Sequence, residues 1–284
     1  MPLRIDFAQA ERGSRNSGER VLQAMIHAYV DDSGDDRKQE YAVCGAVWGD
    51  VFTMKVCEAQ WGHETSSLQK PFRSTDCECQ QGQFKTWEKA DCDNLMSRLV
   101  GVLLDNRIAL LGSTVDIQLF KKVFPDAKKD DPIRLATRHL LVSMSKIARH
   151  MNEHVHVWFE SGPEDADILR AYNEVRSFQF PNPSERRRLS SLTFGDKTLL
   201  PLQAADFAAR ESFKAAQNFR KRPTRKPLSR LWGHAMMQCF DEECLRKLKA
   251  GGDPLSIGAI NGMGTDCHPA MVEATPFSVK RIPI

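Results

Sequence analysis

Three acidic residues lie where an acid is locally unexpected, and they are far apart in the chain. Asp31 directly follows an apolar run, Glu160 ends a second apolar run, and Asp206 lies inside an alanine-rich segment. Carboxylate oxygens on separate elements are the ligands that Mg²⁺ or Mn²⁺ needs for chemistry at phosphorus. If folding brings these acids together, the pattern predicts a site for one or two divalent cations.

Each acid also has an ordinary structural explanation, which the sequence leaves open. Asp31 and Asp32 precede a Ser-Gly pair, and turns of this kind are often acidic. Glu160 is also explained as a solvated strand end. Asp206 would be neutralised by Arg210, four residues later in a helix. Asp206 is the hardest to explain this way, because it lies too deep in the expected helix to cap it and a desolvated carboxylate needs a cation or hydrogen bonds.

The strands and helices expected to position these acids follow one another in an order typical of an α/β protein. Apolar runs and alternating patterns predict strands, and apolar residues at helical spacing predict helices. The expected strands are 26–31, 41–48, 107–117, 154–160 and 188–194. The expected helices are 52–61, 87–106, 132–151, 161–178 and 201–219. The stretch 70–86 reads as a loop, and the small alanines beside Asp206 would let the last helix approach a sheet closely.

The sequence is expected to divide into three regions. Residues 1–24 are expected to be a flexible arm. Residues 25–220 form one α/β domain, with an insertion at about 50–106 between the second and third strands. Residues 221–284 are expected to be a basic segment followed by an irregular extension.

Composition narrows the class of protein. The 284 residues are 41% hydrophobic and 27% charged, which is enough apolar content for a sizeable core. No apolar run is long enough to span a bilayer, so no membrane partner is expected. The first 20 residues lack the apolar stretch of a secretory signal, and a cytoplasmic location is expected.

Basic residues gather in two places that would suit a phosphate backbone. No acid occurs between Glu211 and Asp241, although the formal net charge of the whole chain is only +3. That segment contains Lys214, Arg220, Lys221, Arg222, Arg225, Lys226 and Arg230. A second cluster is Arg186, Arg187 and Arg188. Such clusters predict a DNA or RNA partner, while a solvated loop is the ordinary alternative.

The eight cysteines raise the question of zinc. His63, Cys77, Cys79 and Cys92 form a loose group, but a Cys-x-Cys pair with distant partners lacks the spacing of a zinc finger or ribbon. Free thiols are therefore expected.

Two motifs and one strand end together resemble the domain-of-unknown-function family 3800. They are Asp31-Asp32-Ser33-Gly34, Glu160 and Leu202-Gln203-Ala204-Ala205-Asp206. The resemblance extends over about residues 26–219. It implies a fold similar to ribonuclease H and the retroviral integrases, with a mixed five-stranded sheet flanked by helices.

The resemblance also implies a function. Asp31, Glu160 and Asp206 would be the catalytic metal ligands of a nuclease of the two-metal type, with Asp32 or Asp76 as an auxiliary ligand. Mg²⁺ or Mn²⁺ would be the cofactor, and DNA or RNA the substrate. The residues expected to hold phosphates are Arg73, Arg186, Arg187, Arg188, Lys197, Arg210, Arg220, Lys221 and Arg222.

The chain departs from the family pattern at two positions. Arg73 stands where a histidine is expected, and Asp32 stands where a glutamate is expected. An arginine cannot ligate a metal or act as a general base. These departures suit the alternative of a catalytically inactive ribonuclease H-like protein that binds nucleic acid. A structural protein whose acids serve only turns and caps is a third possibility.

Overall fold

A six-stranded mixed sheet forms the centre of the molecule. The computed structural model describes residues 25–33, 40–128, 131–177, 188–218, 230–231 and 235–250. The strands are β1 (Met25–Ser33), β2 (Tyr41–Asp50), β3 (Ala109–Asp116), β4 (His154–Glu160), β5 (Leu189–Gly195) and β6 (Ala235–Phe240). They lie in the order β5-β4-β1-β2-β3-β6. The first three strands pair antiparallel, whereas β4, β5 and β6 each join a neighbour in parallel.

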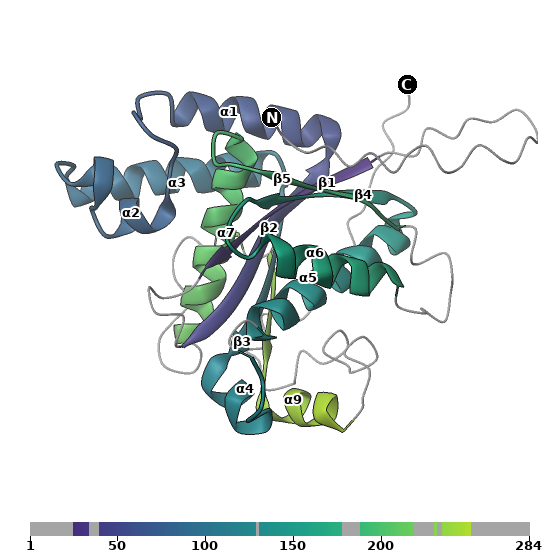
Figure 1. The fold of residues 1–284 in the computed structure, drawn as a ribbon. Coiled ribbons are helices and arrows are strands. Elements are labelled where there is room, and N and C mark those ends of the chain that lie inside the picture. Colours follow the sequence, from purple (N-terminus) through teal and green to yellow (C-terminus); the bar gives the residue numbers. More distant parts are fainter. Residues whose placement is uncertain are drawn as a thin grey trace, which may run out of the picture.

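Helices cover both faces of this sheet (Figure 1). One face packs against α5 (Asp131–Met151) and α6 (Asp165–Ser177), and the other packs against α7 (Leu200–Asn218). The insertion between β2 and β3 adds a third group of helices beside α7. Its elements are α1 (Val51–Glu64), α2 (Ser74–Glu78), the 3₁₀ turn η1 (Gly82–Phe84) and α3 (Lys89–Asp105). Two short helices, α4 (Ile117–Val123) and α9 (Glu242–Lys249), lie together near β6.

This architecture confirms the predicted α/β class, with a mixed sheet flanked by helices and an insertion between the second and third strands. The predicted number of five strands is wrong, because β6 adds a sixth at the edge beside β3. The predicted loop at 70–86 is also wrong in part, since it contains α2 and η1. Both missed segments are short and depend on tertiary partners, which local sequence patterns do not record. Among the described residues, no helix combines the length and apolar character needed to cross a bilayer.

Two separate hydrophobic clusters hold the layers together. The first lies between the sheet and α5 with α6, and the second lies between the sheet, α7 and the insertion. Because α7 has neighbours on both sides, it is buried almost all round, and Leu202, Ala205 and Ala209 are each 0% exposed. A helix buried in this way cannot leave a charged side chain without a partner. Asp206 lies on this helix.

The contact between α7 and the sheet is close because two glycines face the helix. A Cβ atom added at Gly45 of β2 would lie 2.2 Å from the backbone nitrogen of Ala209. A Cβ atom added at Gly112 of β3 would lie 2.2 Å from the Ser212 hydroxyl oxygen. Small residues on both sides therefore set the distance between α7 and strands β2 and β3, and β2 is the direct neighbour of β1, which holds Asp31.

Candidate metal and nuclease site

Asp31 and Glu160 lie beside each other at the carboxyl ends of two parallel strands. The register pairs Tyr29 with Trp158 and Val30 with Phe159, so Asp31 and Glu160 come next on β1 and β4. Residues in register on adjacent strands point to the same face of a sheet. Their face is the one that α7 covers, because Asp31 lies opposite Gly45 in the β1–β2 pair.

Asp206 reaches the same place from α7. Its carboxylate is 15% exposed, and Ser74 at the start of α2 donates to Oδ2 from both its backbone nitrogen and its hydroxyl. The other oxygen, Oδ1, lies 2.7 Å from the ammonium nitrogen of Lys197. Ser74 therefore fixes one side of the carboxylate and leaves the other side turned toward the strand-borne acids.

Lys197 lies at the point where the three acids meet. Its Nζ atom is 3.2 Å from Asp31 Oδ2, 3.1 Å from Glu160 Oε2 and 2.7 Å from Asp206 Oδ1. Its side chain is only 10% exposed. Burial lowers the pKa of this ammonium, but the three carboxylates outweigh burial and raise the pKa above its ordinary value. Lys197 is therefore charged at neutral pH and acts as a counter-ion to the acids.

Asp31 is the most deeply placed of the three acids. Its side chain is 2% exposed. Burial raises the pKa of its carboxyl well above the ordinary range, and a hydrogen bond with Glu160 raises it further, while the Lys197 ammonium opposes both effects. A buried acid with a strongly shifted pKa beside other titratable groups is typical of functional sites.

Gln203 fixes the turn that carries Lys197. Its Nε2 atom donates to the backbone oxygen of Lys197 at 2.8 Å, and its Oε1 atom accepts from Trp61 Nε1 at 3.3 Å and from the Phe72 nitrogen at 3.2 Å. Gln203 is 3% exposed, so these bonds connect the turn after β5, α7 and the insertion inside the protein. Gln203 belongs to the motif noted in the sequence, but its role in positioning a lysine was not predicted.

The two arginines nearest this region behave differently from each other. Arg210 does not pair with Asp206, four residues before it. Its Nε atom instead donates to Glu78 Oε2 of α2 at 2.9 Å, and its side chain is 11% exposed. Arg73 precedes α2 and is exposed. Of these two, Arg73 is the exposed one and Arg210 is largely enclosed.

The structure does not bring Asp32 into the acid cluster. Its cross-strand neighbour Cys44 contacts Thr137 of α5, so Asp32 lies on the face of β1 opposite to that of Asp31. Asp76 lies on α2 with one carboxylate oxygen directed toward Gly82. The three acids that meet at Lys197 are thus those on β1, β4 and α7.

The remaining basic residues expected at the site are not gathered around it. Arg188 donates to Asn152 and to the Glu153 carbonyl, at the amino end of β4, whereas Glu160 is at its carboxyl end. At about 3.3 Å per residue, the length of β4 separates Arg188 from Glu160 by roughly 20 Å. Five other expected residues lie outside the described part of the chain. They are Arg186, Arg187, Arg220, Lys221 and Arg222.

No ready-made metal site is visible in the residues that the structure describes. No three His, Cys, Asp or Glu side chains there have the spacing that one ion would need. Around Lys197, the nearest carboxylate oxygens of the three acids lie 2.7–3.2 Å from the ammonium nitrogen, longer than the roughly 2.0–2.1 Å at which Mg²⁺ binds oxygen. The zinc alternative gains no support, because Cys77 and Cys92 are buried while His63 and Cys79 are exposed.

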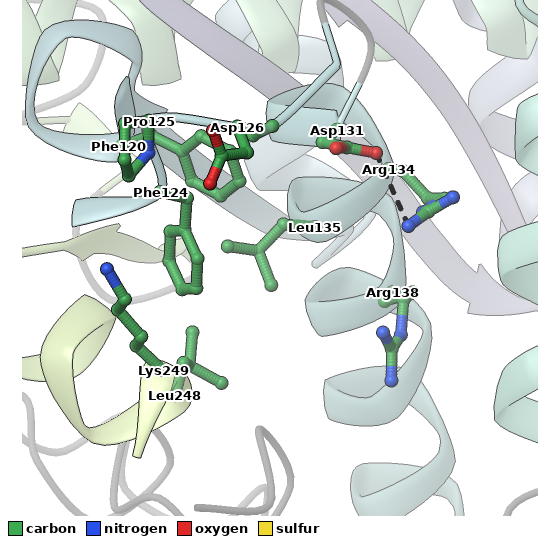
Figure 2. Close-up of a pocket in the computed structure, with 11 residues that line it drawn as sticks. Phe120, Phe124, Pro125, Asp126, Asp131, Arg134, Leu135, Arg138, Leu248 and Lys249 are labelled. Carbon is green, nitrogen blue, oxygen red and sulfur yellow. Dashed lines mark ion pairs between the residues drawn. The ribbon is translucent and has the colours of Figure 1, made fainter. Parts of the chain in front are cut away.

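A pocket of about 480 Å³ lies elsewhere, between α4, α5 and α9 (Figure 2). Most of its charged side chains are already engaged. Arg134 pairs with Asp131 at 3.3 Å, Arg138 pairs with Glu174 at 3.4 Å, and Lys249 donates to a backbone carbonyl. We therefore take the acid cluster at Lys197, and not this pocket, as the candidate functional site.

Replacing Ser74 with alanine tests how Asp206 is positioned. The variant keeps the backbone donor but loses the hydroxyl, so we expect the free energy of unfolding to fall by about 1–2 kcal/mol. We also expect the concentration of Mn²⁺ needed for half-maximal thermal stabilisation to rise severalfold. The matched control is Ser66→Ala, which removes an exposed hydroxyl bond to the His63 carbonyl and is expected to change neither quantity. Equal behaviour of both variants would show that Ser74 does not orient Asp206.

Comparison with known proteins finds similar solved structures but no similar sequences. The chain matches no protein-family model and no curated protein sequence. Among solved structures, it is similar to Bst-RNase HIII in complex with Mn²⁺, with a TM-score of 0.39 and 14% identity, over 83% of this chain and 65% of that one. It is also similar to a chain of the PCNA:RNase HII complex from Archaeoglobus fulgidus, with a TM-score of 0.35 and 10% identity, over 80% of this chain and 89% of that one.

The match to RNase HIII covers only part of the RNase HIII chain. The chain spans slightly less than two thirds of the RNase HIII chain that it matches. Both of these structures contain a ribonuclease H. The resemblance to domain-of-unknown-function family 3800 has no support from the family comparison and stays a prediction from short motifs.

Proposed function

We propose that this chain is a metal-dependent nuclease that cleaves phosphodiester bonds of DNA or RNA. One observation carries the proposal. Three carboxylates from β1, β4 and α7 converge on a single cationic group at the carboxyl ends of two parallel strands. Ligand sites of open α/β sheets lie at this edge.

The donor set suits Mg²⁺ or Mn²⁺. Asp31, Glu160 and Asp206 supply hard carboxylate oxygens, which these ions prefer. The position already attracts positive charge, as the paired Lys197 ammonium demonstrates. These three residues would hold the metal. When bound, it would supply a water of lowered pKa and neutralise charge on the leaving oxygen of the phosphodiester.

The surrounding residues have distinct tasks in this proposal. Ser74 orients Asp206 through two hydrogen bonds. Gln203 holds the Lys197 turn against α7. The exposed Arg73 would contact a phosphate of the substrate. Arg210 would act through Glu78, by tying α2 to α7 next to the acids.

A second candidate function is favoured by Lys197 itself. In a catalytically inactive ribonuclease H-like protein, a lysine would permanently take the place of the metal, and the chain would only bind nucleic acid. Such a protein would bind DNA or RNA with a strong salt dependence and without turnover.

Thermal unfolding with and without Mn²⁺ tests the proposal. A ligand that binds only the folded state raises the unfolding midpoint. At 100 times the dissociation constant it adds about 2.7 kcal/mol to the free energy of unfolding. We expect Mn²⁺ to raise the midpoint of the full chain, and labelled DNA or RNA oligonucleotides to be cleaved only when Mn²⁺ or Mg²⁺ is present. Binding of oligonucleotides without cleavage under any metal would instead favour the inactive alternative.

A further inference from the structure

The Lys197 ammonium forms ion pairs with all three acids of the cluster and donates a hydrogen bond to Asp206. An ammonium has three donors, and Lys197 has three carboxylate neighbours within 3.2 Å. Each neighbour belongs to a different element. The lysine is therefore a cross-link of β1, β4 and α7, as well as a counter-ion.

A divalent cation cannot share this position with the ammonium. A metal held by the same three oxygens would lie at the point where Nζ is now, at 2.0–2.6 Å from each oxygen. Two cationic centres so close together repel each other strongly in a site that is screened from water. Only one of them can occupy the cluster at a time.

Lys197 is also held in place by bonds that do not involve its ammonium. Its backbone is anchored by the Gln203 bond to its carbonyl and by the neighbouring turn, in which Asp196 accepts from the Thr198 nitrogen at 2.8 Å. The ammonium is carried on a flexible four-carbon chain and is 10% exposed. Departure of the ammonium therefore requires rotation about side-chain bonds and the loss of its three ion pairs, but no change in these backbone bonds.

We infer that Lys197 is a resident cation of the acid cluster, which holds the three carboxylates together without metal and must leave before a divalent metal can bind. This inference rests on the proposed function, because Lys197 would regulate the metal site of that function. The consequence is a lowered metal affinity. If the ammonium occupies the cluster nine-tenths of the time, the apparent dissociation constant of the metal rises about tenfold.

The variant Lys197→Met tests this directly, because methionine keeps the length of the side chain and removes its charge. The matched control is Lys89→Met, which removes a lysine paired with one exposed carboxylate, Asp93. In EDTA we expect Lys197→Met to unfold at a lower temperature than wild type, since three acids then share no cation. In Mn²⁺ titrations followed by calorimetry, we expect its dissociation constant to be about tenfold lower than that of wild type. Lys89→Met is expected to match wild type in both measurements.

The outcomes separate this inference from the function on which it rests. Wild type and Lys197→Met could bind Mn²⁺ equally strongly, with binding lost in both when Asp206→Asn is added. That result overturns the role of Lys197 but supports the metal site. Absence of Mn²⁺ binding in wild type and in Lys197→Met overturns both. Binding by Lys197→Met alone supports the inference and identifies the wild-type chain with the inactive alternative.

A second measurement uses the wild-type protein and does not depend on how well the variant folds. Acetylation of lysines, followed by mass spectrometry, reports which ammonium groups are accessible. We expect Lys197 to be protected in EDTA and to become severalfold more reactive when Mn²⁺ saturates the site, while Lys89 stays reactive throughout. Continued protection of Lys197 in the Mn²⁺-saturated protein would overturn the inference.

Discussion

Replacing Asp206 with asparagine is expected to abolish Mn²⁺- or Mg²⁺-dependent cleavage of DNA or RNA, with a loss of rate on the order of a thousandfold. Asparagine keeps the size of the side chain but removes the negative charge that faces the cation position. Asp31→Asn is expected to act in the same way. The fold should persist in each variant, because Lys197 keeps two carboxylates. Cleavage of labelled oligonucleotides measures the first effect, and circular dichroism measures the second.

The control for these variants is Asp105→Asn at the exposed end of α3. It makes the same chemical change away from the cluster, and we expect wild-type cleavage. Retained cleavage in both Asp31→Asn and Asp206→Asn would remove the basis of the nuclease proposal. If a variant loses cleavage because it no longer folds, circular dichroism will show the loss of secondary structure. Glu160→Gln then provides a third test of the same charge requirement.

Replacing Gly45 with alanine is expected to lower the free energy of unfolding by about 3 kcal/mol or more. The added methyl group would lie 2.2 Å from the Ala209 nitrogen, 2.3 Å from its Cα atom and 2.6 Å from the Ala208 carbonyl carbon. All three are backbone atoms, so no side-chain rotation relieves the overlap and α7 has to move. Because α7 carries Asp206, we expect Mn²⁺-dependent stabilisation to weaken as well. Chemical denaturation with and without Mn²⁺ measures both effects.

Gly101→Ala provides the matched control for Gly45→Ala. Gly101 lies within α3, and a Cβ atom added there meets no other atom within 4 Å. Alanine is favoured over glycine in a helix, so this variant is expected to be more stable by roughly 0.5–1 kcal/mol. The same substitution thus has opposite signs at the two sites. A destabilisation of less than 1 kcal/mol in Gly45→Ala would contradict the close packing of α7 on β2.

Much of the scaffold was predictable because its signals are local. The expected strand at 154–160 coincides with β4, and the expected helix at 201–219 corresponds to α7 within one residue at each end. Apolar alternation and alanine content are properties of neighbouring residues, which a single sequence displays. By contrast, α2 lacks a side-chain cap and is held by the bonds of Ser74 and Glu78 to α7. Those partners are more than 130 positions away along the chain, so the segment read as a loop.

The position of Lys197 also depends on tertiary structure and not on local sequence. In the sequence it follows Gly195 and Asp196 in a polar turn, and a lysine in such a turn is normally exposed. The family resemblance implies that it holds a phosphate, whereas the structure places it among the three acids. Its burial results from α7 closing over the ends of β1, β4 and β5, which no local pattern records.

The amino-acid sequence alone determined which of the main segments form strands or helices and which side chains are acidic. Strand alternation, helix periodicity and side-chain type are properties of single residues and their near neighbours. Only the tertiary structure decided which acids share one point and which cation they meet there. The reason is that Asp31, Glu160, Lys197 and Asp206 become neighbours through the register of β1 with β4 and the close approach of α7 to Gly45, and both are relations between segments far apart in the sequence.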